Sequence, residues 1–263
     1  MDESSEFEIV GVLHLPALPG APLNRLCFED ILGHAMKDAS ALTEGGIQRC
    51  VIENFGDTPF RSGAVDPHVP AMLATIGQSV RRAYGMTVGM NVLRNDARAA
   101  LGAAVACGAE FIRVNVLVGS AWTDQGLIHG EADSLLRYRR SLCGSGAGPR
   151  IYADVNVKHA VPAGADHIGF TAIEAIERSG ADGVIVTGSR TGAPTDLTQV
   201  AMVRDAIKGR PVWVGSGVTA DTIVDVSKVA RGAIIGTALH EDGNIESPID
   251  KDRVRSMVEA LRS

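Results

Sequence analysis

The stretch RSGADGVIV (178–186) contains the unit from which we predict the fold. A helical segment ends near Gly180, and the apolar run GVIV begins after only two further residues. Glycine is favoured just past a helix C-terminus because it adopts positive φ without a Cβ clash. The same order of helix, glycine and apolar run recurs in TEGGIQRCVI (43–52) and ACGAEFIRV (106–114). This repetition predicts helices that alternate with strands.

Eight short runs of β-branched and apolar residues are spread along the 263-residue chain, and most are separated by segments with helical apolar spacing. Eight strands alternating with helices, without a linker, predict a single α/β domain over residues 1–263, a (β/α)8 TIM barrel. An open doubly wound sheet is the alternative, but HLPALPG (14–20) follows the first run in place of a G-x-G-x-x-G motif. The predicted strands cover residues 9–15, 49–55, 87–93, 111–118, 150–158, 182–188, 211–217 and 232–239.

The composition narrows the class of protein. The formal net charge of −6 disfavours a nucleic-acid partner. No apolar run is long enough to span a bilayer, and MDESSEFEIV (1–10) lacks the basic and apolar parts of a signal peptide. Four widely spaced cysteines without a C-x-x-C pair indicate reduced thiols. We expect a cytoplasmic protein with no nucleic-acid partner and no integral membrane segment, and a homo-oligomer, since such barrels commonly associate through outer helices.

Polar residues interrupt the predicted strands near their C-terminal ends, where the active sites of barrels form. Asp154 and Lys158 lie on one face of the predicted strand 150–158, and the burial of two ionisable groups is costly unless they are paired. We predict that Asp154, Lys158 and Glu53 are catalytic, through a carboxylate general base or a desolvated lysine with a lowered pKa. The residues predicted to bind the substrate are His14, Asn91, Arg113, Asn115, Asp124, Gln125 and Thr187.

A structural role is the alternative for several of these residues. Arg113 could pair with Asp154 or Glu53 in the barrel interior, as readily as it could contact a substrate. His14 could form a hydrogen bond in the core. For Thr187, which ends a predicted strand, a bond to a loop backbone is the favoured interpretation.

The long segment VGSAWTDQGLIHGEA (118–132) follows the fourth predicted strand and carries Asp124 and Gln125. Its glycines are candidate hinges, so the segment could close over the barrel mouth as a lid. A surface loop anchored by a buried Trp122 is the alternative.

Glycine-rich stretches follow the last three predicted strands. GSGVT (215–219) and GTAL (236–239) occupy the places where barrels often hold a phosphate by backbone N–H groups. TGSRTG (187–192) adds a third such loop, with Arg190 as a candidate charge partner. The alternative is that all three are merely tight turns. The predicted phosphate-binding residues are Gly188, Gly215, Ser216, Gly217, Gly236 and Thr237.

The spacing of ligand-type residues indicates no metal or cofactor. The sequence contains no H-x-H, HExxH or G-K-[ST] motif. A divalent cation would require the fold to bring Glu53, Asp96 and Asp154 together. We therefore predict no cofactor and assign no metal ligand.

Seven long stretches carry distinctive motifs. They are GVLHLPALPGAP (11–22), VIENFGDTPF (51–60), VGMNVLRNDARAAL (88–101), FIRVNVLVGSAWTDQGLIHGEA (111–132), ADVNVKHA (153–160), VIVTGSRTG (184–192) and VGSGVT (214–219). Together they resemble the BtpA/SgcQ family over nearly the whole chain. The resemblance implies a TIM barrel of the phosphate-binding type. The family is named after a cyanobacterial factor needed for stable accumulation of photosystem I, and other members occur in bacteria and archaea without photosynthesis, some beside sugar-metabolism genes.

Three functions are compatible with these features. The first is an enzyme acting on a phosphorylated sugar or nucleoside-like molecule by isomerisation, aldol-type cleavage or glycosidic-bond transfer. The second is a non-catalytic assembly or stability factor for a membrane complex, of the photosystem I type. The third is a regulatory barrel that binds a ligand without chemistry. Polar strand ends that face inward favour the first, because an assembly factor does not need them.

Overall fold

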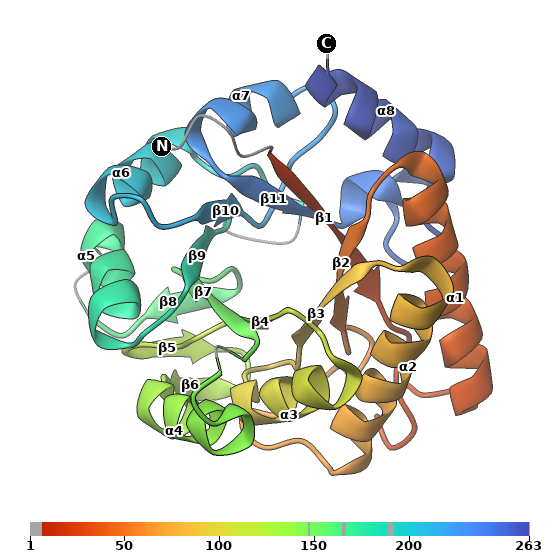
Figure 1. Cartoon of the computed structure of the whole chain (residues 1–263), viewed down its shortest axis with the longest axis horizontal. Coiled ribbons are helices and arrows are strands. Elements are labelled where there is room, and N and C mark those ends of the chain that lie inside the picture. The colour runs from red at the N-terminus through yellow and green to blue at the C-terminus, as the bar shows by residue number, and fades with distance from the viewer. Residues whose placement is uncertain (1–6, 147, 165–166, 189–191, 263) are drawn as a thin grey trace.

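Eight parallel strands form a closed barrel, surrounded by helices, in the computed structural model, which describes residues 7–146, 148–164, 167–188 and 192–262 (Figure 1). The predicted (β/α)8 barrel is therefore confirmed. The barrel strands are β1 (Glu8–His14), β2 (Arg49–Glu53), β3 (Thr87–Asn91), β4 (Phe111–Val114), β7 (Arg150–Val155), β9 (Gly183–Val186), β10 (Val212–Val214) and β11 (Gly232–Ile235). The helices are α1 (Phe28–Gly45), α2 (His68–Tyr84), α3 (Ala97–Cys107), α4 (Ala132–Cys143), α5 (Ile168–Ile173), α6 (Leu197–Ala206), α7 (Ile223–Val229) and α8 (Lys251–Arg262), with the short turns η1 (Glu174–Arg178), η2 (Thr237–Leu239) and η3 (Glu241–Gly243).

The first strand closes the barrel by pairing with both the second and the last. Glu8 of β1 is in register with Gly232 of β11, and Gly11 is in register with Cys50 of β2. Because every strand has two neighbours, no barrel strand presents an open edge. All eight carboxyl ends meet at one mouth, which is where the polar strand ends gather.

The glycines of the repeated unit lie where the sequence predicts them. Gly46 after α1, Gly108 after α3 and Gly180 after η1 have φ values of 103°, 70° and 63°. Each of them therefore ends a helical segment in the left-handed region, and the chain turns at once into the next strand.

Apolar side chains fill the barrel below the mouth. Trp213 stacks on Tyr152 at 3.9 Å between ring centroids, and Phe111 meets Trp213 edge-on at 5.4 Å. Val10, Val12, Val51, Ile185 and Ile234 complete this interior cluster. A second, larger apolar layer lies between the strands and the surrounding helices. The lower barrel is thus a packed core, and we expect a ligand to enter from the carboxyl ends.

Every barrel strand ends earlier than predicted, by one to four residues, and two segments differ in a way that affects the site. The strand predicted over 150–158 ends at Val155, so the alternation of faces does not continue to Lys158. The segment 118–132 forms the hairpin β5 (Ser120–Thr123) and β6 (Gly126–His129), and β8 (Ala160–Pro162) joins it in a small antiparallel sheet. The anchor predicted as an alternative is wrong, because Trp122 is 57% exposed.

None of the helices in the described residues combines the length and the hydropathy that crossing a bilayer requires.

Candidate functional site

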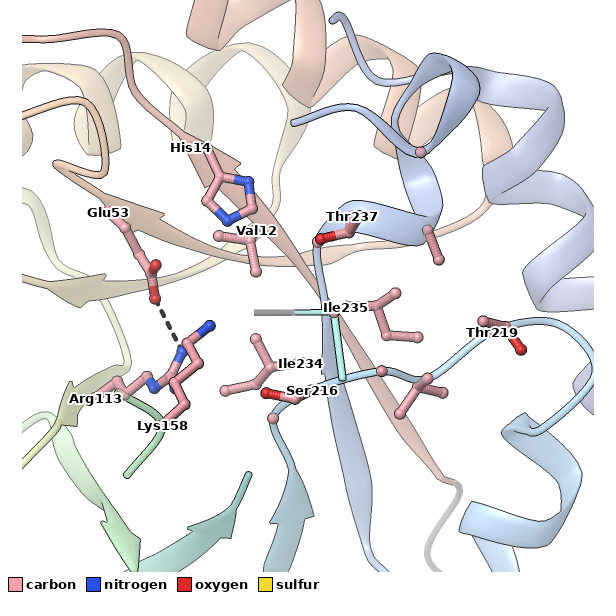
Figure 2. A pocket seen from close by; sticks show the side chains of 17 residues that line it. Val12, His14, Glu53, Arg113, Lys158, Ser216, Thr219, Ile234, Ile235 and Thr237 are labelled. Atoms are coloured by element: carbon pink, nitrogen blue, oxygen red, sulfur yellow. Dashed lines mark hydrogen bonds and ion pairs between the residues drawn. The ribbon is translucent and has the colours of Figure 1, made fainter. Parts of the chain in front are cut away.

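The barrel mouth holds a cavity of ≈ 140 Å³ with two chemically different walls (Figure 2). Val12 and Ile234 of the interior core contribute its apolar part. We call one wall the charged side: it consists of Glu53, Arg113 and Lys158. We call the other the glycine side: it consists of Gly215, Ser216, Gly217, Gly236 and Thr237, which follow β10 and β11.

Arg113 on β4 lies between two carboxylates in the barrel interior. Its Nη1 donates to Glu53 Oε1 at 3.1 Å, and its Nε donates to the Asp154 oxygens at 3.3 and 3.2 Å. Its Nη2 lies 3.2 Å from Asp154 Oδ2 without hydrogen-bond geometry, and among the described residues this buried nitrogen has no acceptor. A Cβ built on Gly215 would lie 3.7 Å from Nη2, so this donor points toward the glycine side.

Glu53, at the end of β2, is held as a carboxylate. Burial raises the pKa of Glu53, but the charge of Arg113 above all, together with Lys158 and a hydrogen bond from Asn91, outweighs burial and leaves this pKa below its usual value. Asn91 Nδ2 donates to Oε1 at 2.9 Å, so Oε1 accepts from both Asn91 and Arg113. The described residues provide no donor for Oε2, which leaves this oxygen as a candidate base.

Lys158 reaches the mouth from a turn that follows β7. Asn156 and His159 flank it with φ values of 54° and 57°, which is why the strand pattern stops before it. The Lys158 N–H donates to Thr187 Oγ1 at 3.0 Å, and Arg94 Nη2 donates to the Lys158 carbonyl oxygen at 2.8 Å. Hydrogen bonds from two neighbouring segments therefore hold this turn in place and set the position of the Lys158 backbone.

The Lys158 amine is suited to react in its neutral form. Burial lowers the pKa of Lys158, and the nearby Arg113 and Arg94 lower it further, against the opposing effect of Glu53 and Asp154. No described residue accepts a hydrogen bond from Nζ. A lowered pKa increases the fraction of the amine in its neutral form, which can act as a nucleophile or a base.

His14, at the end of β1, lies between the two walls and is part of a buried chain of hydrogen bonds. His240 Nδ1 lies 2.6 Å from the Ser247 carbonyl oxygen, which can only accept, so this nitrogen carries a proton. His240 Nε2 lies 3.3 Å from His14 Nδ1. A donor role for His14 Nδ1 in this pair leaves the lone pair of His14 Nε2 free. Burial lowers the pKa of His14 to about 3, so its ring is neutral.

The glycine side leaves polar groups without protein partners. Ser216 Oγ is buried with no hydrogen-bond partner in the described residues, and the Ser216 and Gly217 N–H groups donate to none of them. Gly217 has a φ of 68°, and a Cβ there would lie 2.4 Å from the Ala193 carbonyl oxygen. At Gly236 a Cβ would lie 2.5 Å from the His14 ring. Because neither glycine has a side chain, the Ala193 carbonyl oxygen can lie close to Gly217, and the His14 ring can lie close to Gly236.

A second cavity of ≈ 520 Å³ adjoins the first and shares Glu53, Arg113 and Lys158 with it. Three further residues predicted to contact the substrate line this second cavity. They are Asn91, Asn115 and Asp124.

Other predicted site residues lie outside both cavities. Asp154 is behind Arg113, with its oxygens taken by Arg113 and by Asn115 Nδ2 at 2.7 Å. Thr187 holds the Lys158 turn, as its structural alternative predicts. Gln125 donates to Asp124, and a Cβ on Gly188 would lie 2.5 Å from the Ala193 carbonyl oxygen. Arg190 lies outside the described residues.

The three strand-end carboxylates considered for a cation do not converge. Asp96 caps α3 by accepting from the Ala99 N–H at 2.9 Å, and its other oxygen accepts from the Val65 N–H. Glu53 and Asp154 are separated by the Arg113 guanidinium.

Two residues of the site escape prediction from the sequence. His240 follows η2 and forms a hydrogen bond with His14. Arg94 follows β3 and donates to the Lys158 carbonyl oxygen. In both cases the partner is distant in the sequence. A faint signal for His240 is its position directly after the GTAL stretch. Arg94 stands among Asn95 and Asp96 in a polar stretch after a strand, without a feature that distinguishes it.

Known proteins resemble this chain in sequence and in fold. The photosystem I biogenesis protein BtpA of Synechocystis is 42% identical over 96% of this chain and 87% of its own length. An uncharacterised protein of Thermococcus kodakarensis is 40% identical, covering 97% of this chain and 95% of its own. The structure of a 3-hexulose-6-phosphate synthase superposes with a TM-score of 0.61 at 16% identity, over 97% of this chain and 100% of that one, which shows a shared fold. The model of the BtpA family matches residues 5–263, and the chain belongs to this family.

Proposed function

We propose that the protein is an enzyme acting on a phosphorylated sugar or nucleoside-like small molecule. The phosphate would lie on the glycine side and the reacting carbon against the charged side. One observation carries the proposal: two buried donor atoms without a hydrogen-bond acceptor in the described residues belong to side chains of one small cavity. They are Ser216 Oγ and Arg113 Nη2, and Lys158 lines the same cavity.

An anionic ligand explains this arrangement. Buried donors without acceptors are costly, and a phosphate oxygen would satisfy each of them. The N–H groups of Ser216 and Gly217 add backbone donors of the kind that commonly bind phosphate. The shared fold with a 3-hexulose-6-phosphate synthase is consistent with a phosphorylated ligand.

The charged side supplies the chemistry. In its neutral form, Lys158 Nζ can add to the carbonyl carbon of an open-chain sugar and, with loss of one water, form an imine. Glu53 Oε2 or His14 Nε2 can take a proton from a neighbouring carbon or hydroxyl. A lyase, an isomerase and a glycosyl-transfer enzyme can all use these groups. Asp154 would then act through Arg113, as a positioning residue.

A thermal-unfolding screen tests the phosphate part of the proposal. Ribose 5-phosphate and glucose 6-phosphate should raise Tm, whereas ribose and glucose should not. Ser216→Ala should remove most of the shift while leaving Tm without ligand unchanged. Gly217 is a poor test position, because any side chain there meets the Ala193 backbone. If no phosphorylated compound raises Tm, the phosphate site is refuted.

Borohydride reduction tests the amine part. Reduction in the presence of pyridoxal 5′-phosphate, a phosphorylated aldehyde, should place an adduct on Lys158 that mass spectrometry locates in a peptide digest. Excess inorganic phosphate and Ser216→Ala should both reduce labelling. Labelling spread over the exposed Lys37, Lys208 and Lys228, without preference for Lys158, would contradict a reactive amine at the mouth.

A second candidate function is assembly of a membrane complex, which the name of the Synechocystis relative suggests. One surface feature favours it: Trp122 is in register with Leu127 on one side and Val161 on the other, and all three are exposed. If Trp122→Ser abolishes association with membranes and Lys158→Met does not, this candidate is favoured over the enzyme.

A further inference from the structure

The two cavities at the mouth are adjacent chambers with a common wall. Glu53, Arg113 and Lys158 line both, so the groups assigned to the chemistry stand between them. The first chamber, of ≈ 140 Å³, contains the glycine side. The second, of ≈ 520 Å³, is considerably larger. A ligand with its phosphate in the first chamber can therefore extend past the charged side into the second.

One part of the second chamber is apolar and aromatic. Phe55 and Phe60 line it, with ring centroids 6.5 Å apart at 65°, and Leu93 adds an aliphatic surface. Both rings are only partly buried, so each offers part of its surface to the chamber. Phe55 also packs edge-on against His14 at 4.7 Å, which connects this wall to the first chamber.

The remaining wall is polar and includes an unused acceptor. Asn115 Nδ2 donates to Asp154, but Asn115 Oδ1 is buried without a donor in the described residues. Asp124 adds a carboxylate at the exposed rim. Acceptors of this kind bind a ligand that carries N–H or O–H donors. The phenylalanine rings pack best against a flat apolar surface of the ligand.

We infer that the second chamber binds a planar ring carrying at least one hydrogen-bond donor on its edge. The ligand is then a phosphorylated sugar joined to such a ring, as in a nucleoside monophosphate, and not a free sugar phosphate. The ring packs on Phe60, its edge meets Asn115 Oδ1, and the bond between ring and sugar lies beside Lys158 and Glu53. This inference rests on the proposed phosphate site and names the substrate class for it.

Isothermal titration calorimetry tests the inference, with AMP, GMP, CMP and UMP compared with ribose 5-phosphate. At least one of the four nucleotides should bind about tenfold or more tightly than ribose 5-phosphate. Phe60→Leu keeps an apolar side chain but removes the flat ring, and it should abolish this advantage while leaving ribose 5-phosphate unaffected. Phe170→Leu is the matched control, because Phe170 on α5 is 62% exposed and lines neither chamber.

The outcomes separate this inference from the function on which it rests. If all four nucleotides bind no more tightly than ribose 5-phosphate, and Ser216→Ala weakens them all, the ring chamber is refuted and the phosphate site stands. If Phe60→Leu and Phe170→Leu weaken nucleotide binding equally, the aromatic wall plays no specific part and the inference fails. If neither ribose 5-phosphate nor any nucleotide binds, both proposals fall together.

Discussion

The two walls of the mouth differ in how their polar groups are satisfied. On the charged side, Glu53 and Arg113 hold one another in place, and Asp154 and Asn91 secure them from behind. On the glycine side, Ser216 Oγ and two neighbouring N–H groups have no partner in the described residues. Internal pairing holds most of the charged side in place, apart from the free Arg113 Nη2, whereas the donors of the glycine side are available to a ligand. Substitutions on the charged side should therefore affect folding, and those on the glycine side should affect binding.

Removal of the central cation should have the largest effect. Arg113→Met leaves Glu53 and Asp154 as neighbouring buried carboxylates without a counter-charge, and we expect a loss of about 3–5 kcal/mol in the free energy of unfolding. Urea unfolding at pH 7 measures this loss. Arg137→Met is the control, because its ion pair with Asp133 is 79% and 78% exposed and should matter by less than about 0.5 kcal/mol. A loss below about 1 kcal/mol for Arg113→Met would mean that the charged side is not held by pairing.

The neutral ring of His14 should make stability depend on pH. The pKa of His14 is about 3 in the folded chain, against about 6.5 when unfolded, so the unfolded chain binds the extra proton between these values. The neutral ring therefore adds its full share to the free energy of unfolding above pH 6.5. Below pH 6.5 this share falls by up to about 1.4 kcal/mol per pH unit. His14→Gln should lack that part of the slope in urea unfolding between pH 6.5 and 4.5, although Glu53 titrates in both proteins. The exposed His34 supplies the control, since His34→Gln should keep the wild-type slope. Equal slopes for His14→Gln and the wild type would contradict a buried neutral ring.

Loss of the histidine chain should have an intermediate effect. His240→Phe removes the acceptor for His14 Nδ1 and the donor for the Ser247 carbonyl, at a cost of about 1–3 kcal/mol. In ¹⁵N-edited NMR spectra, His14 should carry its proton on Nδ1 in the wild type and lose this preference in His240→Phe. His240→Gln, which can restore an acceptor, should recover part of both properties. An unchanged His14 tautomer in His240→Phe would show that His240 does not orient His14.

The smallest effect on folding should come from the glycine side. Ser216→Ala removes a buried hydroxyl without a partner, so the free energy of unfolding should change by less than about 0.5 kcal/mol in the absence of ligand. The same variant should lose most of the stabilisation by ribose 5-phosphate, which urea unfolding with and without the compound measures. A large loss without ligand would indicate that Ser216 serves the fold, and the contrast between the walls would disappear.

Much of the fold, and the place of the site, could be predicted from local pattern. Apolar runs separated by helical spacing predict the barrel, and parallel closure then gathers the strand ends at one mouth. Pattern fails where the backbone leaves regular geometry. The prediction that Asp154 and Lys158 share a strand face requires regular alternation up to residue 158. Asn156, with a φ of 54°, ends this alternation, and the periodicity of the sequence does not show a positive φ.

The sequence by itself determined the order of the elements, the glycine turns between them and the end of the barrel where polar residues collect. These features follow from the spacing of apolar residues and from the backbone preferences of residues such as glycine, both of which act over a few residues. Only the tertiary structure decided which polar groups are satisfied and which are free. Asp154 lies behind Arg113 and His240 meets His14 across 226 positions because strands distant in the chain close into one ring. Pairing of this kind depends on distance in space, which residue order does not express.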